Sequence, residues 1–376
     1  MNPCFGSGPC AKRTGWKSPS CHLVGRSHRS AKGLKLIQET IQLQRSILHI
    51  PEDYLIGIVD GSCTGVMEML IWNLVGARPV DVLAHCVFSN HWAHDIADEL
   101  QVAPVNLIKA PFPTMSDVNR VDFSHDVVFC MSSTTSGVAF RDTNWIPQNR
   151  EGLTLCDAAS AAFAIDLDWS KLDAAGFSWQ KGLGGEGGFG TIVLSPKAVQ
   201  RLESFRPNRA IPRIFRIVND GKLNYALFNG NTINTPSLLC IEEFYENLKW
   251  ADDNGGMSFL TSKVEANYQT VKSWVSSQNL FKFLVEEKFR AHHIACLDIN
   301  DEWYQSKSKD EKWDFLRKIV NQAEEKNWGY DFLGHILTEP HLRIWCGPTV
   351  DAENLQEFLP HLIELYQDAR QHNDID

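Results

Sequence analysis

The sequence lacks the features by which membrane and secreted proteins are recognised. No stretch approaches the roughly 18 consecutive apolar residues of a membrane span, and the N-terminus, MNPCFGSGPCAKRTGWKS, lacks the apolar run of a secretory signal. Internal repeats and low-complexity segments are absent as well. We therefore expect a cytoplasmic protein that does not bind membranes.

Positive charge is scarce relative to negative charge. The 36 lysines and arginines face 46 aspartates and glutamates, so the formal net charge is −10. Proteins that bind nucleic acid by neutralising its phosphates usually carry an excess of positive charge. The balance argues against a nucleic-acid partner and favours a small metabolite as the ligand.

Cysteine pairs with the spacing of a metal site are also missing. The ten cysteines include no CxxC pair and no compact cluster typical of zinc binding. We interpret them as reduced thiols and predict no metal site. They stand at positions 4, 10, 21, 63, 86, 130, 156, 240, 296 and 346.

The composition that is present is that of a globular α/β protein. Its 376 residues are 43% hydrophobic and 22% charged, enough for one large α/β domain and a smaller one. Apolar spacing predicts a helix within residues 30–50, and residues 54–76 have the pattern of a strand, a tight turn and a helix. This alternation is typical of a mostly parallel sheet with helices on both faces, which binds ligands at the carboxyl ends of its strands. Further short apolar runs occupy residues 81–88, 127–131, 153–158, 174–179 and 190–195.

The pattern changes after about residue 260. Polar helices are predicted at residues 309–326 and 351–368, and short strands at 281–285, 294–299 and 342–346. Such a mixture is typical of a two-layer α+β domain. We predict three parts: an N-terminal segment lining the active site (1–30), a large cofactor-binding α/β domain (31–260) and a small C-terminal α+β domain (261–376).

A glycine-rich stretch, SWQKGLGGEGGFG at residues 178–190, places Lys181 beside a backbone with few side chains. Gly182, Gly184 and Gly187 match the spacing GxGxxG, but a dinucleotide-binding fingerprint follows a strand and opens a helix. Here the β-branched run TIVLSP follows instead. The loop is therefore either a flexible turn or a place where the backbone closely approaches a ligand near Lys181, rather than a dinucleotide-binding fingerprint.

Lys181 indicates a specific kind of site when it is considered together with Asp157, which ends the apolar run LTLCD. A lysine that binds covalently and an aspartate that pairs with a protonated ring nitrogen are the two anchors of a pyridoxal phosphate site. Taken singly, the aspartate would more often be a helix cap and the lysine a solvated charge. Two further segments suit the same cofactor: GSCTG at residues 61–65 offers backbone amides to a phosphate, and Trp92 offers an aromatic face to the ring.

These residues lie within motifs that resemble the phosphoserine aminotransferases, in the Methanosarcina-type branch of the class V aminotransferases. The resemblance covers nearly the whole chain and implies a fold type I pyridoxal phosphate enzyme, with a mostly parallel seven-stranded sheet and a smaller C-terminal α+β domain. It is carried by FGSGPCAKRTGW, GRSHRS, GSCTG, TTSG, CDAASAAFAIDLDWSKLD, SWQKGLGGEGG, GKLNYALFNGNTINTPS and LRIWCG.

The resemblance implies a role for each matching residue around pyridoxal 5′-phosphate. Lys181 would bind the cofactor covalently and act in catalysis, Asp157 would hold the ring nitrogen, and Trp92 would stack on the ring. The cofactor's other contacts would come from Thr134 near the ring, from Gln180, Ser62 and Cys63 at the phosphate, and from Asn234 and Thr235 of a neighbouring subunit. The active unit would then be a homodimer with shared sites.

For the substrates, the resemblance implies that Arg343 binds the α-carboxylate and that His28 and Arg29 receive a phosphate group. The planar guanidinium of arginine can donate two parallel hydrogen bonds to a carboxylate. Taken alone, Arg343 would be read as a surface-paired sheet residue and His28 as a loop histidine. The implied reaction transfers the amino group of L-glutamate to 3-phosphohydroxypyruvate, giving O-phospho-L-serine in serine biosynthesis.

Several positions depart from the pattern that is usual in this family, including asparagines of FNGNTINTP where glutamates are expected, and they leave the acceptor open. Cys63 stands where aspartate is usual, Phe189 where histidine is common, and Leu337 where an arginine is expected. An aminotransferase acting on a different 2-oxo acid is therefore an alternative. A lyase or desulfurase of the same fold is another, although desulfurases stack a histidine where this chain has Trp92. A binding protein without turnover is a third.

Overall fold

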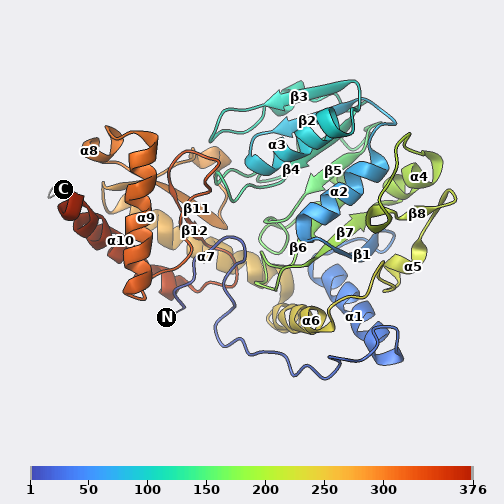
Figure 1. Ribbon diagram of the computed structural model, residues 1–376, viewed down its shortest axis with the longest axis horizontal. Helices are drawn as coiled ribbons and strands as arrows, with labels where there is room; N and C mark the ends of the chain where they lie inside the picture. The colour runs from blue at the N-terminus through green and yellow to red at the C-terminus, as the bar shows by residue number, and fades with distance from the viewer. Residues whose placement is uncertain (1, 374–376) are drawn as a thin grey trace.

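Seven strands between residues 55 and 194 form the central sheet (Figure 1). The structure, a computed structural model, describes residues 2–373. The strand order is β1-β7-β6-β5-β4-β2-β3, in which β7 is antiparallel to both neighbours and the other pairs are parallel. The prediction of a mostly parallel, seven-stranded sheet is confirmed. The strands are β1 (Leu55–Asp60), β2 (Val80–Ala84), β3 (Val105–Lys109), β4 (Asp126–Cys130), β5 (Thr154–Asp157), β6 (Ala174–Ser178) and β7 (Phe189–Leu194).

Helices cover both faces of this sheet because its strands are apolar on both sides (Figure 1). In β4, Val127 and Phe129 belong to the core under α1 and α6, whereas Val128 and Cys130 belong to the core under α2 and α3. Strands buried on both faces require such a three-layer arrangement. The covering helices are α1 (Ala31–Ile47), α2 (Ser62–Leu74), α3 (Val87–His94), α4 (Pro196–Ser204) and α6 (Leu238–Asp253).

The small domain contains a three-stranded antiparallel sheet, in the order β10-β11-β12, packed against long helices (Figure 1). Helix α7 begins in the large-domain core with Met257 and Leu260 and continues into the small-domain core with Val271. The predicted boundary at residue 260 thus falls inside α7, and the division into domains stays a prediction. The elements are α7 (Gly256–Ser276), β10 (Phe281–Phe283), β11 (Ile294–Ile299), α8 (Glu302–Gln305), α9 (Lys309–Glu325), β12 (Leu342–Trp345) and α10 (Ala352–Asn373).

Short elements complete the fold. A two-stranded ribbon of β8 (Val218–Asn219) and β9 (Lys222–Leu223) and the single turn α5 (Tyr225–Phe228) connect α4 to α6. Among the residues described, no helix is both long and apolar enough to cross a membrane. Five further short helices, one of π type and the others 3₁₀, occupy Asp95–Glu99, Val118–Arg120, Trp169–Lys171, Arg213–Phe215 and Glu287–Phe289.

Two elements differ from what the sequence predicts. The apolar run at residues 81–88 is strand only as far as Ala84, because Cys86 and Ser89 form a reciprocal N-terminal cap that starts α3. Strand β3 was not predicted at all. It lies at the edge of the sheet, where its residues are mostly half-buried and give a weak apolar signal.

The N-terminal segment joins the two domains before α1 begins. Phe5 exchanges backbone hydrogen bonds with Tyr330 (3.1 Å) and Trp345 (2.9 Å) of the small domain. Farther along, the Cys10 amide donates to the carbonyl of Gln180 (2.8 Å) in the large domain. The segment is therefore held directly beside Lys181.

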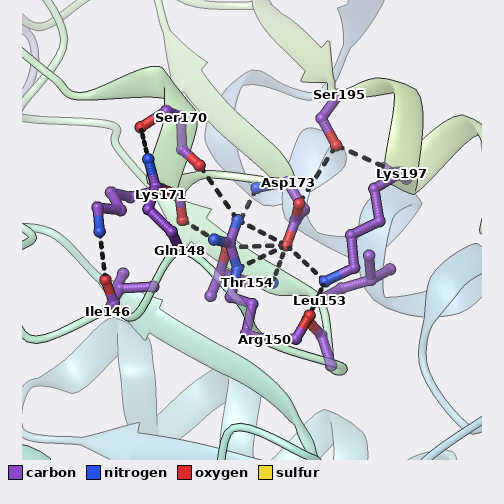
Figure 2. A network of polar contacts seen from close by, with 12 residues as sticks. Ile146, Gln148, Arg150, Leu153, Thr154, Ser170, Lys171, Asp173, Ser195 and Lys197 are labelled. Carbon is purple, nitrogen blue, oxygen red and sulfur yellow. Dashed lines mark hydrogen bonds and ion pairs between the residues drawn. The ribbon is translucent and has the colours of Figure 1, made fainter.

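At the amino ends of β5 and β6, a buried ion pair fastens the sheet to the preceding loops (Figure 2). Arg150 donates to Asp173 from Nη2 (3.0 Å) and Nε (3.1 Å), and the two side chains are 4% and 5% exposed. The same carboxylate accepts from the amide of Thr154 (2.9 Å) and lies 3.8 Å from the ammonium of Lys197. This network lies at the opposite end of the strands from Asp157.

Replacing Asp173 with asparagine should lower the free energy of unfolding by about 3–5 kcal/mol, because it leaves Arg150 charged, buried and unpaired. Urea titration followed by circular dichroism measures the loss. Glu339→Gln is the control, since its pair with Lys309 is about half exposed and should contribute less than about 1 kcal/mol. Equal effects of the two substitutions would contradict this account.

Candidate active site

A cavity of about 230 Å³ opens at the carboxyl ends of the central strands. It brings together seven of the nine residues predicted to bind the cofactor. Residues from β5, α2 and α3 and from the loops after β4 and β6 line it together, which is the expected place for a ligand in a parallel sheet. The seven are Ser62, Cys63, Trp92, Thr134, Asp157, Gln180 and Lys181.

Lys181 lies in the turn that follows β6 and lines the cavity. Its Nζ donates to the carbonyl oxygen of Ser7 and to Oγ1 of Thr134 (3.3 Å). Burial lowers the pKa of this amine, and the positive charge of Arg343 contributes to the same shift. A larger fraction of the amine is therefore unprotonated, as a nucleophile or base requires.

Asp157 ends β5 and is 5% exposed. Its Oδ1 accepts from the Ala159 amide (2.9 Å), and its Oδ2 accepts from the indole Nε1 of Trp92 (3.0 Å). These bonds orient the carboxylate within the cavity. A negative charge held in this way can stabilise a proton on a nitrogen of a bound ring.

The first turn of α2 offers backbone amides without a side-chain cap. Gly61 occupies the N-cap position in the left-handed conformation (φ 87°) and makes no side-chain cap bond. The amides of Gly61 (2.8 Å) and Ser62 (3.4 Å) both donate to the carbonyl of Gly188, so the glycine-rich loop lies against the start of the helix. The next residues, Ser62, Cys63 and Thr64, line the cavity. Uncapped amides at a helix N-terminus are suited to a phosphate group.

The residues of the cavity fit pyridoxal phosphate. Oε1 of Gln180 and Oγ of Ser178 line the cavity, are buried, and have no partner among the residues described. Buried polar atoms normally have a hydrogen-bond partner, so these two atoms are consistent with a polar ligand. An amine, a carboxylate, a buried indole and an anion-binding helix start are the groups that this cofactor needs.

Arg343 belongs to β12 of the small domain and approaches the same region. Its Nε donates to the Leu333 carbonyl (2.8 Å) and its Nη1 to the Thr134 carbonyl (3.4 Å). Within residues 2–373, Nη2 has no recorded partner. Burial lowers the pKa of the guanidinium from its high ordinary value. The geometry leaves one edge of the guanidinium for a ligand.

Besides Arg343, four predicted residues do not line this cavity. His28 is buried and Arg29 is exposed in the segment that precedes α1. Asn234 and Thr235 are exposed. The roles assigned to these four residues stay predictions, since one chain alone does not bring them to Lys181.

Other residues of the cavity were missed by sequence reasoning. Gly8 and Phe88 line it, and Ser132 and Ser160 bond to each other through their hydroxyls (2.8 Å) in its wall. Only the motif FGSGPC gave a signal for Gly8, and that signal carried no specific role. All ten cysteines are free, and the described part of the chain holds no group of three or more His, Cys, Asp or Glu suited to a metal ion.

A methyl group at Gly8 should interfere with Lys181, since a Cβ there would lie 2.6 Å from Nζ and 3.2 Å from Cε. Gly8→Ala is expected to displace the amine and weaken pyridoxal phosphate binding by about 1–3 kcal/mol, roughly five- to 150-fold in Kd. Absorbance titration of the cofactor-free protein measures this. Gly187→Ala, which meets nothing within 4 Å, should bind normally. Equal affinities of the two variants would contradict the expectation.

Comparison with known proteins places this geometry in a family. No protein-family model matches the chain. A phosphoserine aminotransferase of Methanosarcina barkeri is 44% identical over 358 residues, which are 94% of each chain. A crystal structure of a phosphoserine aminotransferase from Cytophaga hutchinsonii superposes with a TM-score of 0.79 at 20% identity, covering 97% of this chain and 99% of that one.

A phosphoserine aminotransferase from Trichomonas vaginalis, solved with pyridoxal phosphate bound, has a TM-score of 0.78 at 19% identity, over 95% of this chain and 98% of that one. At such identities the two solved structures establish the fold alone. The Methanosarcina relative is similar over almost the full length at much higher identity. This chain therefore belongs to the phosphoserine aminotransferase family, in its Methanosarcina-type branch.

Proposed function

We propose that this protein is a pyridoxal phosphate-dependent phosphoserine aminotransferase. It transfers the amino group of L-glutamate to 3-phosphohydroxypyruvate, yielding 2-oxoglutarate and O-phospho-L-serine for serine biosynthesis. The observation that carries the proposal is that Asp157, at the end of β5, and Lys181, in the turn after β6, line one cavity together with Trp92. Its curated relatives in Methanosarcina bear the name of this activity.

The side chains of the cavity divide the work between binding and proton transfer. When bound, pyridoxal phosphate supplies the electron sink that makes the α-proton of an amino acid removable. Lys181 would take that proton from the α-carbon and deliver it to C4′ of the cofactor, since burial keeps part of its amine unprotonated. The carboxylate of Asp157 would stabilise the positive charge of a protonated ring nitrogen. Trp92 lines the cavity and excludes water.

Arg343 binds the α-carboxylate that both substrates share. Arg343→Lys keeps the charge but loses the planar fork, so KM for L-glutamate should rise by about ten- to a hundredfold, the range of a charge-assisted hydrogen bond. The value of kcat should change less. Steady-state kinetics measure both, and thermal melting reports whether the fold is intact. An unchanged KM would remove Arg343 from this role.

The acceptor is tested directly by loading the protein with amino groups from L-glutamate and offering 2-oxo acids singly. We expect 3-phosphohydroxypyruvate to restore the original absorbance fastest. Leu337 is 65% exposed where an arginine was expected, so other anionic oxo acids and neutral ones belong in the same screen. A faster neutral acid would favour the alternative aminotransferase, and alanine formed from cysteine would favour a desulfurase.

A homodimer in the cytoplasm is part of this proposal. Asn234 and Thr235 are exposed and outside the cavity of their own chain, as residues donated to a second subunit would be. The same stretch also exposes the apolar residues Ile214, Tyr225 and Leu239. Light scattering should give twice the mass of one chain. A monomer with full activity would exclude shared sites.

A further inference from the structure

The carboxylate of Asp157 accepts four hydrogen bonds, arranged as one N–H and one S–H on each oxygen. The Cys63 thiol donates to Oδ1 (3.2 Å) beside the Ala159 amide, and the Cys130 thiol to Oδ2 (3.5 Å) beside the Trp92 indole. An ionised carboxylate offers about four acceptor positions. Groups of the chain itself occupy all of them, so a ring nitrogen that donates to Asp157 must replace one of these partners.

Both thiols keep their protons and so act as donors. Burial raises the pKa of Cys63 and of Cys130 well above the usual value, and the charge of Asp157 adds to each shift. Cys63 lies in the first turn of α2, where a helix would favour the thiolate, but burial and the carboxylate outweigh that effect. Thiols are weak donors, weaker than the two N–H groups on the same oxygens.

Cys130 is the partner that is most easily replaced. Its bond is the longest of the four, and it shares Oδ2 with Trp92. The Cys86 thiol is a neighbour to which it could turn, since the influence of Cys130 is the largest cause that lowers the pKa of Cys86 to about 7. By contrast, the alternative acceptor for Cys63, the carbonyl of Gly176, lies 4.0 Å away.

We propose that the Cys130 thiol gives up its place on Oδ2 of Asp157 when the cofactor's ring nitrogen binds there, while the Cys63 thiol stays on Oδ1. The proposal rests on the proposed function, since it requires pyridoxal phosphate in this cavity. A thiol suits this task because it satisfies the carboxylate when no cofactor is bound and yields to a stronger donor. A hydroxyl at the same position would compete with the ring nitrogen, whereas a methyl group would not.

The matched pair of variants is Cys130→Ser and Cys130→Ala. We expect Cys130→Ser to raise the Kd for pyridoxal phosphate about tenfold, and Cys130→Ala to change it by no more than about twofold. A purely structural role predicts the reverse order, because serine is nearly the size of cysteine and alanine leaves a void. Cys156 is the control. It precedes Asp157 in β5 but belongs to the core on the opposite face of the sheet, so Cys156→Ser should not alter the Kd through Asp157.

The displacement has its own readout, the infrared S–H stretching band of the whole protein. The difference between wild type and Cys130→Ala identifies the Cys130 band, which should shift when pyridoxal phosphate is added, while the Cys156 band stays in place. An unmoved Cys130 band, or a Kd raised more by alanine than by serine, would overturn this inference while leaving the proposed function intact. A wild-type protein that binds no pyridoxal phosphate would overturn both.

Discussion

Lys181→Ala should lower kcat for transamination by about 10²- to 10⁴-fold from the loss of the proton-transferring base alone. The variant also loses the covalent link to the cofactor. After treatment with borohydride, wild-type protein should carry pyridoxal phosphate fixed to the peptide that contains Lys181, and the variant should carry none. Kinetics and peptide mass mapping check the two expectations separately.

Lys181→Arg is the matched control for charge. Arginine stays protonated in proteins, so it retains the positive charge of the site but serves neither as nucleophile nor as base. Both variants should therefore lose activity to a similar extent. A fixed adduct in Lys181→Ala, or activity in Lys181→Arg near that of wild type, would show that a different amine performs the chemistry.

Asp157→Asn should lower kcat by about 10²- to 10³-fold, as expected for the loss of one preorganised electrostatic contact to the reacting group. The amide keeps the size of the side chain but removes the charge that holds a proton on the ring nitrogen. The cofactor should still bind, with an absorbance spectrum whose pH dependence differs from that of wild type. Absorbance titration and steady-state kinetics measure the two effects.

Asp126→Asn distinguishes this effect from general damage. Asp126 is also fully buried and charged, but it pairs with Arg201 (2.7 Å) at the amino end of β4, far along the sheet from the cavity. The substitution should lower the thermal stability and leave the cofactor spectrum unchanged. If it altered the spectrum as Asp157→Asn does, the spectral change would report stability rather than ring protonation.

The sequence predicted the parts of the site that follow strongly patterned segments. Asp157 ends an apolar run, and Lys181 comes soon after another, so both were expected at the carboxyl edge of the sheet. The uncapped start of α2 was likewise visible as GSCTG between a strand and a helix. Such features can be predicted because each depends on residues that are close together in the sequence.

The residues that were missed owe their places to contacts between distant parts of the chain. Gly8 reaches the cavity because the Cys10 amide bonds to the Gln180 carbonyl. No periodic pattern in the sequence predicts this contact. Cys130 meets Asp157 because β4 and β5 are paired in parallel with these two residues in register. Register between strands depends on the assembled sheet, so the contact between the Cys130 thiol and Asp157 could not be predicted from single segments of the sequence.

A crystal structure of the protein with pyridoxal phosphate tests the central claim most directly. We predict continuous density from Nζ of Lys181 to the cofactor, and the ring nitrogen within about 2.6–3.2 Å of the Asp157 carboxylate. Density joined to a different lysine, or a ring nitrogen turned away from Asp157, would contradict the account.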